Sequence, residues 1–266
     1  MNPEDPIIRR DPSVSNLIEP DGEPEPRSTP VAEPGRVATV LYEPEATFEA
    51  VRSRPDWLIP LLLLIAMSVG FRYLVQPRID MGPYFQNLSE RIADRSGMTE
   101  QQRKAQFDQM MDRAAGGQNI FVVLLSVPAV LLIVTLLMWG AMRMSGGPST
   151  FMQTFSVTLY SWMPQLIKSL VLMALMIPRS SVDMRFLGTI LKSHPGAFVD
   201  PIESPVLSAA LSWIEIFNIW SIILFVIGLA VINRFSKAKV GIFVVVLYLV
   251  AAAIGIGFVA LQSKFM

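Results

Sequence analysis

The segment SWIEIFNIWSIILFVIGLAVINRF, residues 212–235, decides the fold of this chain. Apolar residues dominate it, and a bilayer core about 30 Å thick is crossed by about 20 helical residues. The segment therefore predicts a membrane-spanning helix. Near its beginning, however, stand a carboxylate, Glu215, and an amide, Asn218. These two side chains mark either a working site inside the membrane or only the polar rim of the helix.

Four further apolar stretches of comparable length occur in the chain. Hydrophobic residues make up 52% of the 266 residues and charged residues only 17%, whereas a soluble domain has about 25% charged residues. This composition predicts an all-α membrane protein, a five-span transmembrane helical bundle. The expected spans are residues 57–75, 120–142, 153–177, 213–232 and 240–261.

The amino-terminal part of the chain differs in composition from the rest. Proline is interspersed with Asp, Glu, Arg and Ser, as in EPDGEPEPRSTPVAEPGR at residues 19–36. Such a segment cannot bury enough apolar surface to offset the entropy lost on ordering. We therefore predict a disordered, proline-rich cytoplasmic tail at residues 1–40 and a membrane domain at residues 41–262. The tail is either a docking segment for a partner or a solubilising leader.

Two helices are predicted outside the spans. Residues 41–56, just before the first span, are expected to form a short interfacial helix on which Phe48 and Val51 share a face. In the loop after the first span, Thr99 and Gln102 have the spacing of a capping box at the start of a helix.

One short loop gives the clearest signal for the orientation of the chain. The loop NRFSKAK, residues 233–239, contains three cations and no acidic residue, and loops rich in Lys and Arg face the cytoplasm. This loop favours an amino terminus in the cytoplasm, although the Lys and Arg residues that flank all five spans, counted together, do not decide the orientation. Because the number of spans is odd, the carboxyl terminus is then expected on the opposite side.

Two ionisable residues fall within the expected spans, Lys168 in the third and Glu215 at the start of the fourth. Ser204 and Pro205 are suited to begin a helix, and a continuous helix from there places Glu215 just below the lipid surface. In the predicted orientation, Lys168 and Glu215 belong to the same half of the bilayer and can form an intramembrane polar pair. Separate snorkelling to the interface and a transport or proton-relay role are the alternatives.

Other features of the spans concern helix geometry and helix contacts. Pro128 and Pro164 remove backbone hydrogen bonds from the second and third spans and are the predicted helix kinks. In the last span, small residues recur at four-residue spacing in AAAIGIG, residues 251–257. Such spacing allows close helix contact, either within the bundle or between copies in a homo-oligomer.

No catalytic, cofactor-binding or metal-ligating residue is predicted. The chain has no Cys and a single His, and it contains no P-loop, HExxH or GxSxG motif. Its net charge of zero gives no reason to expect nucleic acid as a partner. The expected partners are the lipid bilayer and proteins, membrane-bound or cytoplasmic, that bind through residues 1–56.

Three stretches together resemble the Yip1 family, in particular its bacterial members. They are LYEPEATFEAVRSRPDWLIPLLLL at residues 41–64, YSWMPQLIKSL at residues 160–170 and ESPVLSAALSWIEIFNIWSIILFVIGLAVINRFSKAKVG at residues 203–241. The resemblance implies a five-helix integral membrane protein with a cytoplasmic amino terminus, in a bacterial inner membrane or, in a eukaryote, in the Golgi or ER membrane. Eukaryotic members are associated with Rab GTPases, but this chain lacks their Asp-Leu-Tyr-Gly-Pro stretch.

The sequence therefore predicts a non-enzymatic polytopic membrane protein of the Yip1 type that acts as an adaptor or membrane organiser. The alternative is a small oligomeric transporter or channel, which requires a polar path across the bundle.

Overall fold

The computed structural model describes residues 33–116 and 120–265. The chain divides into two compact units, Met1–Pro30 and Val31–Met266, and the described residues belong to the second. Most of the predicted tail, residues 1–32, lies outside the described residues. Its expected last part is not a tail, because residues 33–39 form a helix.

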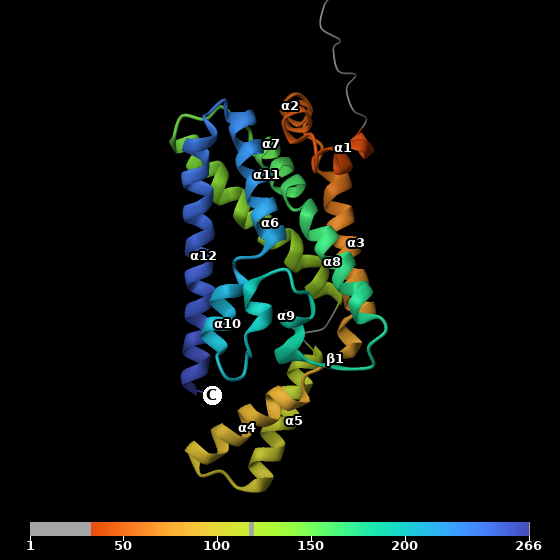
Figure 1. Ribbon diagram of the computed structural model, residues 1–266, viewed down its shortest axis with the longest axis vertical. Helices are drawn as coiled ribbons and strands as arrows, with labels where there is room; N and C mark the ends of the chain where they lie inside the picture. The colour runs from red at the N-terminus through yellow and green to blue at the C-terminus, as the bar shows by residue number, and fades with distance from the viewer. Residues whose placement is uncertain (1–32, 117–119, 266) are drawn as a thin grey trace, which may run out of the picture. The chain divides into compact units, whose positions relative to one another are not determined.

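Helices dominate the described residues, and five apolar helical stretches are long enough to cross a membrane (Figure 1). The predicted five-span α-helical bundle is therefore confirmed. The stretches are Leu58–Arg78, with α3 (Leu58–Leu74) and the 3-10 turn η2 (Gln76–Arg78); Ile120–Met144, which is α6; Phe151–Met176, divided into α7 (Phe151–Ser161) and α8 (Met163–Met176); Pro205–Asn233, divided into α10 (Pro205–Ser212) and α11 (Ile216–Asn233); and Lys237–Ser263, within α12 (Lys237–Phe265).

Shorter elements precede and connect these stretches. They are α1 (Glu33–Thr39) and α2 (Pro44–Ser53) before α3; α4 (Gly82–Ser96) and α5 (Glu100–Gly116) before α6; and η3 (Met184–Phe186), α9 (Leu187–Ile190) and η4 (Pro195–Phe198) before α10. Among the described residues, the only strands are β1 (Ile79–Asp80) and β2 (Val182–Asp183), which pair in parallel and join the loops that follow α3 and α8.

The core of the bundle lies around α7 and α11. Every residue of α7 from Thr154 to Ser161 is buried, and α11 contributes Leu224 and Leu229, which are also fully buried. In contrast, α3, α6 and α12 expose many Leu, Ile and Val side chains. Such surfaces are stable against acyl chains, which are as apolar as the side chains themselves, so the outer helices fit a lipid environment.

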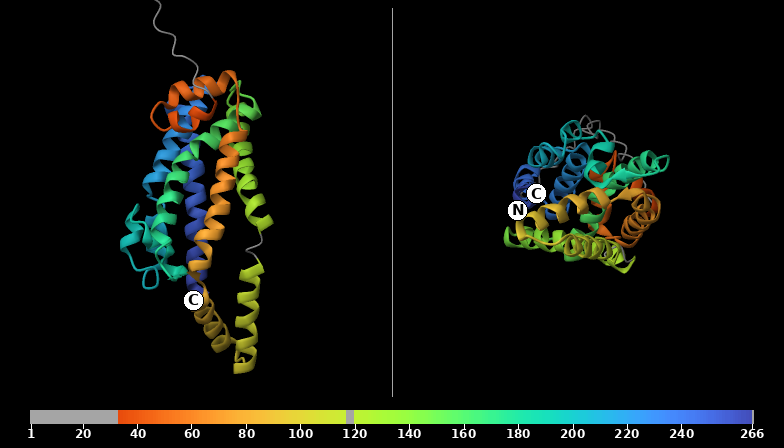
Figure 2. Two further views of the ribbon diagram at one scale, coloured as in Figure 1. Left: turned by 90° about the vertical axis from the view of Figure 1, so that its right-hand side faces the viewer. Right: turned by 90° about the horizontal axis from the view of Figure 1, so that it is seen from below.

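The segment before the first span is part of the bundle. α1 and α2 lie across one end of the spanning helices, and the carboxyl end of α12 lies at the other (Figure 2). A helix forms where one was predicted, but Phe48 and Val51 are 0% exposed and face the bundle rather than lipid. Gly228 of α11 makes this approach possible, since a Cβ there would lie 2.6 Å from Val157 Cγ1 and 2.9 Å from Phe48 Cε1.

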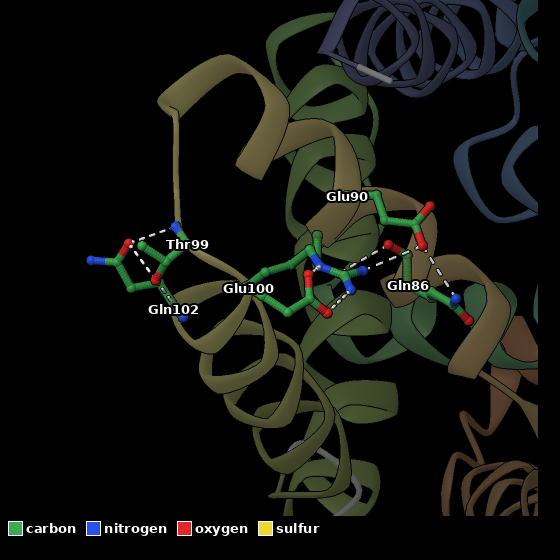
Figure 3. Close-up of polar contacts among 7 residues, drawn as sticks. Gln86, Glu90, Thr99, Glu100 and Gln102 are labelled. Atoms are coloured by element: carbon green, nitrogen blue, oxygen red, sulfur yellow. Dashed lines mark hydrogen bonds and ion pairs between the residues drawn. The ribbon is translucent and has the colours of Figure 1, made fainter.

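Helices α4 and α5 form a hairpin with polar surfaces (Figure 3). Gly97 ends α4 in the left-handed conformation, with φ of 62°. The predicted capping box is confirmed, because Thr99 N donates to Gln102 Oε1 at 2.9 Å and Gln102 N donates to Thr99 Oγ1 at 3.4 Å. Next to it, hydrogen bonding and the positive charge of Arg103 lower the pKa of the Glu100 carboxyl below its ordinary value.

Candidate functional site

Two of the five apolar stretches are broken helices. α7 and α8 are separated at Trp162, and Pro164, which has no N–H to donate, lies in the first turn of α8. α10 and α11 are separated at residues 213–215. Neither break lies at the end of its apolar stretch. Backbone groups freed at such depth have no water available and must find partners inside the protein.

Glu215 caps α11 at one of these breaks. Its backbone is extended, with φ of −112° and ψ of 132°, and its carboxylate accepts hydrogen bonds from Phe217 N at 3.3 Å and Asn218 N at 3.1 Å. A carboxylate satisfies free N–H groups at a helix start and is stabilised by the helix dipole there. The expectation that Glu215 lies inside a continuous helix is therefore wrong, because α10 ends at Ser212 and α11 begins at Ile216 with Glu215 as its N-cap.

The structure brings Lys168 and Glu215 together. Lys168 Nζ of α8 lies 3.2 Å from Glu215 Oε2, and the two side chains are 31% and 1% exposed. The same carboxylate thus caps α11 and forms an ion pair with α8. The opposite charges neutralise each other in a region where an unpaired charge is strongly unfavourable.

A second polar group follows about one turn closer to α1 and α2. Gln165 Nε2 of α8 donates to Asn218 Oδ1 at 3.0 Å and to Ser221 Oγ at 3.3 Å, both on α11. Residues three apart on a helix share a face, so Gln165 with Lys168, and Glu215 with Asn218 and Ser221, form two facing polar rows across the α8–α11 contact.

This polar group forms one wall of a cavity of about 410 Å³. The cavity lies among α6, α7, α8, α11 and α12. Its lining is mostly apolar, with a few polar and aromatic side chains: Val130, Val134, Ser161, Trp162, Gln165, Trp213, Asn218, Ser221, Ile222, Phe225, Val244, Leu247, Tyr248 and Ala251.

Aromatic side chains close the break before α11. The Tyr248 hydroxyl of α12 donates to the Trp213 carbonyl, so this freed backbone acceptor is satisfied from a neighbouring helix. The two rings contact edge to face with centroids 5.4 Å apart. A Cβ at Gly255 would lie 2.8 Å from Trp213 Cζ2, so one face of the predicted small-residue segment packs against Trp213 within the chain.

Nearer to α1 and α2, the hydroxyl groups on the same face of α7 are hydrogen-bonded within the bundle. Thr154, Thr158 and Ser161 continue the row of Gln165 at helical spacing, but each hydroxyl bonds to a carbonyl of its own helix. Thr135 of α6 donates to Thr158 at 3.0 Å. The three Thr side chains are 0% exposed, so this region is a packed contact between α6 and α7.

A separate buried ion pair fastens α1 to this end of the bundle. Arg36 Nη1 lies 3.0 Å from Asp56 Oδ1, and the side chains are 7% and 9% exposed. The Tyr160 hydroxyl of α7 donates to Asp56 Oδ2 at 2.5 Å. In addition, Gln153 Nε2 donates to the Arg52 carbonyl at 2.6 Å. Polar contacts thus hold the α1–α2 segment on α7.

Comparison with known proteins identifies the family. A model of the Yip1 domain matches residues 38–260 of the chain. The chain belongs to the Yip1 family. It is similar to the membrane protein YknW of Bacillus subtilis (strain 168), with 27% identity over 214 residues that cover 79% of this chain and 83% of the relative. No solved structure matches the chain. The family, the relative and the five apolar stretches together make it a polytopic integral membrane protein.

Within this Yip1 domain, the two prolines singled out from the sequence have different surroundings. Pro164 lies at the α7–α8 break, whereas Pro128 lies inside α6, which runs from Ile120 to Met144 as one helix. Across residues 33–116 and 120–265, no group of three His, Asp or Glu side chains is arranged to hold a metal ion.

Sequence reasoning missed several members of both polar groups of the Yip1 domain. Gln165 and Ser221 could have been found, because they stand three residues from Lys168 and Asn218, which were noted. The set of Arg36, Asp56 and Tyr160 gives no local signal, since its members are far apart in sequence and meet only in the fold.

Proposed function

We propose that this chain is a non-enzymatic adaptor or membrane organiser, whose helical bundle holds an amino-terminal segment at one membrane surface. The observation that carries the proposal is the attachment of α1 and α2 to α7 and α11, which makes residues 33–56 part of the bundle. The region proposed to bind partners therefore narrows from residues 1–56 to residues 1–32.

We place the amino terminus in the cytoplasm of a bacterial cell and the carboxyl terminus across its inner membrane. Two observations support this orientation. α1 and the carboxyl end of α12 lie at opposite ends of the spanning helices, and loops rich in Lys and Arg face the cytoplasm. The loop between α11 and α12, residues 233–239, carries Arg234, Lys237 and Lys239 without an acidic residue and supplies this signal, whereas the total number of Lys and Arg residues is similar at the two ends of the spans. The Bacillus relative supports a bacterial cell membrane.

Deletion of residues 2–32 tests the adaptor role. Full-length and shortened proteins are expressed at equal levels, cross-linked in native membranes and purified in detergent, and their partners are identified by mass spectrometry. A third chain carries residues 2–32 in scrambled order, which preserves the composition and charge of the segment. We expect both altered chains to insert normally and to lose the partners of the full-length protein. Recovery of the same partners by the shortened chain would refute the role assigned to residues 1–32.

A small transporter, acting as an oligomer, is the second candidate function. The cavity between two broken helices and the buried Lys168–Glu215 pair favour it, because transporters commonly place substrate sites at such breaks. Self-association can use the outer face of α12 at Ala253 and Gly257, since a Cβ added at Gly257 meets no atom within 4 Å. Solute flux in proteoliposomes tests the candidate. Flux that Glu215→Gln abolishes without unfolding the protein would rank the transporter above the adaptor.

A further inference from the structure

The cavity can be reached from the lipid-facing surface of the bundle. Val130 of α6 and Ala251 of α12 both line the cavity and are exposed. These two helices make few contacts with each other, and both belong to apolar stretches that span the membrane. The molecules that enter between them are therefore those dissolved in the acyl-chain region.

One polar atom in the lining has an unused hydrogen-bonding capacity. The amide nitrogen of Gln165 donates to Asn218 and Ser221, but its Oε1 accepts no hydrogen bond from any residue in the described ranges 33–116 and 120–265. Gln165 is also only partly buried. An amide acceptor without a partner is unfavourable in an apolar surrounding, and because Gln165 is one of the residues that line the cavity, a ligand with an O–H or N–H group can supply the missing donor.

The charge of the site selects against ions. Among the residues that the structure describes, no Asp, Glu, Lys or Arg lines the cavity. Lys168 and Glu215, one turn away, neutralise each other at 3.2 Å. A fatty-acid anion or a cationic amphiphile would find no opposite charge in the lining, and the burial of an unpaired charge in a low-dielectric region is costly. The lining therefore fits a neutral molecule.

We propose that this cavity is a binding site for a neutral amphiphile, a lipid with an apolar chain and a hydroxyl group that donates a hydrogen bond to Gln165 Oε1. The apolar side chains of α6, α11 and α12 hold the chain, and Trp162, Trp213 and Tyr248 border the polar wall. The volume of about 410 Å³ lies within the range of about 300–1,000 Å³ of small-molecule sites. The site goes beyond the proposed adaptor role and does not depend on it.

An ordinary phospholipid chain is the competing occupant. The ester oxygens of a phospholipid are acceptors only, so they leave Gln165 Oε1 unpaired. The charged phosphate of the same lipid belongs at the headgroup level rather than beside the two helix breaks. The distinction between a hydroxyl donor and an ester of equal length is therefore the decisive property of the ligand.

Photo-labelling of the full-length protein tests the site. The probe is a hexadecanol analogue with a diazirine in the chain and an alkyne tag, added to protein in phosphatidylcholine nanodiscs. We expect saturable labelling that maps to peptides of α6, α8 and α12. Unlabelled hexadecanol should compete, whereas methyl palmitate, which has no donor, should not. Equal competition by both compounds would overturn the role of the hydroxyl group.

Variants locate the site within the bundle. Ala251→Phe fills the cavity, and we expect it to lower labelling about tenfold or more, the effect of about 1.4 kcal/mol of binding free energy. Val246→Phe is the matched control, because Val246 is exposed on the same helix and does not line the cavity; its labelling should equal that of wild type. Unchanged labelling of a folded Ala251→Phe protein would overturn the site. If that variant does not fold, Val130→Phe blocks the cavity from α6, and the competition and peptide map of the wild-type protein still decide.

Discussion

Replacement of Lys168 by Met removes the positive partner of a carboxylate that is only 1% exposed. At 3.2 Å and an effective dielectric constant of about 20, the two unit charges attract each other by about 5 kcal/mol. Desolvation of both groups opposes this attraction, and the loss of one partner from a buried pair costs about 3–5 kcal/mol. Because the Lys168 side chain is 31% exposed, we expect the lower value, a decrease of about 3 kcal/mol in the free energy of unfolding.

The same replacement in a Glu215→Gln background isolates the interaction energy between Lys168 and Glu215. Gln keeps an oxygen that can accept hydrogen bonds from Phe217 N and Asn218 N, but it has no charge. There we expect Lys168→Met to lower the free energy of unfolding by about 1 kcal/mol or less, which gives a coupling energy of about 2 kcal/mol. The assay is reversible unfolding by dodecyl sulfate in mixed micelles, followed by tryptophan fluorescence.

Lys104→Met provides the matched control for the cycle. Lys104 is exposed on α5, so the same substitution there should change the free energy of unfolding by no more than about 0.5 kcal/mol. Equal losses for Lys168→Met in the wild-type and Glu215→Gln backgrounds would refute the reasoning. They would mean that Lys168 reaches the membrane–water interface independently of Glu215 and that Glu215 acts only as a helix cap.

The spans were predictable because they depend on local composition alone. A run of about 20 apolar residues has one favourable environment, which is lipid, and no tertiary contact is needed to recognise it. The Thr99–Gln102 capping box was predictable for the same reason, since both partners stand within one helical turn.

The helix break before Glu215 was not predictable from the sequence. The residues SWIE at 212–215 contain neither Gly nor Pro, and the broken backbone is satisfied by groups from other helices. Tyr248 pairs with the Trp213 carbonyl, and Lys168 pairs with the capping carboxylate. A local pattern cannot reveal partners that lie tens of residues away.

The candidate site was predictable only in part. The polar rows on α8 and α11 follow from the spacing of Gln165 with Lys168 and of Glu215 with Asn218 and Ser221. The cavity beside them depends on how five helices pack, and the attachment of α2 depends on the space left at Gly228. Both are properties of complementary shape, for which residue spacing gives no information.

Three further substitutions test other contacts. Gly228→Leu places a side chain against Phe48, and we expect a loss of about 1–3 kcal/mol in unfolding free energy. Phe48→Ala in the same chain should recover part of it, whereas additive losses would contradict the contact. Tyr160→Phe removes the hydroxyl that donates to Asp56 of the Arg36–Asp56 ion pair, and we expect it to lower the free energy of unfolding by about 1.5–3 kcal/mol. The control is Tyr73→Phe at an exposed position of α3, which should cost less. The third, Asp183→Asn, tests a pH effect. Hydrogen bonding and charge from Arg185 hold the pKa of the Asp183 carboxyl below its ordinary value, and a carboxyl group lowered on folding contributes stability that is present above its unfolded pKa and lost as pH falls through the folded pKa. The rate of amide hydrogen exchange in η3 and α9, corrected for the intrinsic pH dependence of exchange, should therefore increase as pH falls below about 4. Asp183→Asn should abolish this pH dependence. Exchange that stays constant through this window in the wild-type protein would show that the Asp183–Arg185 contact does not stabilise the loop.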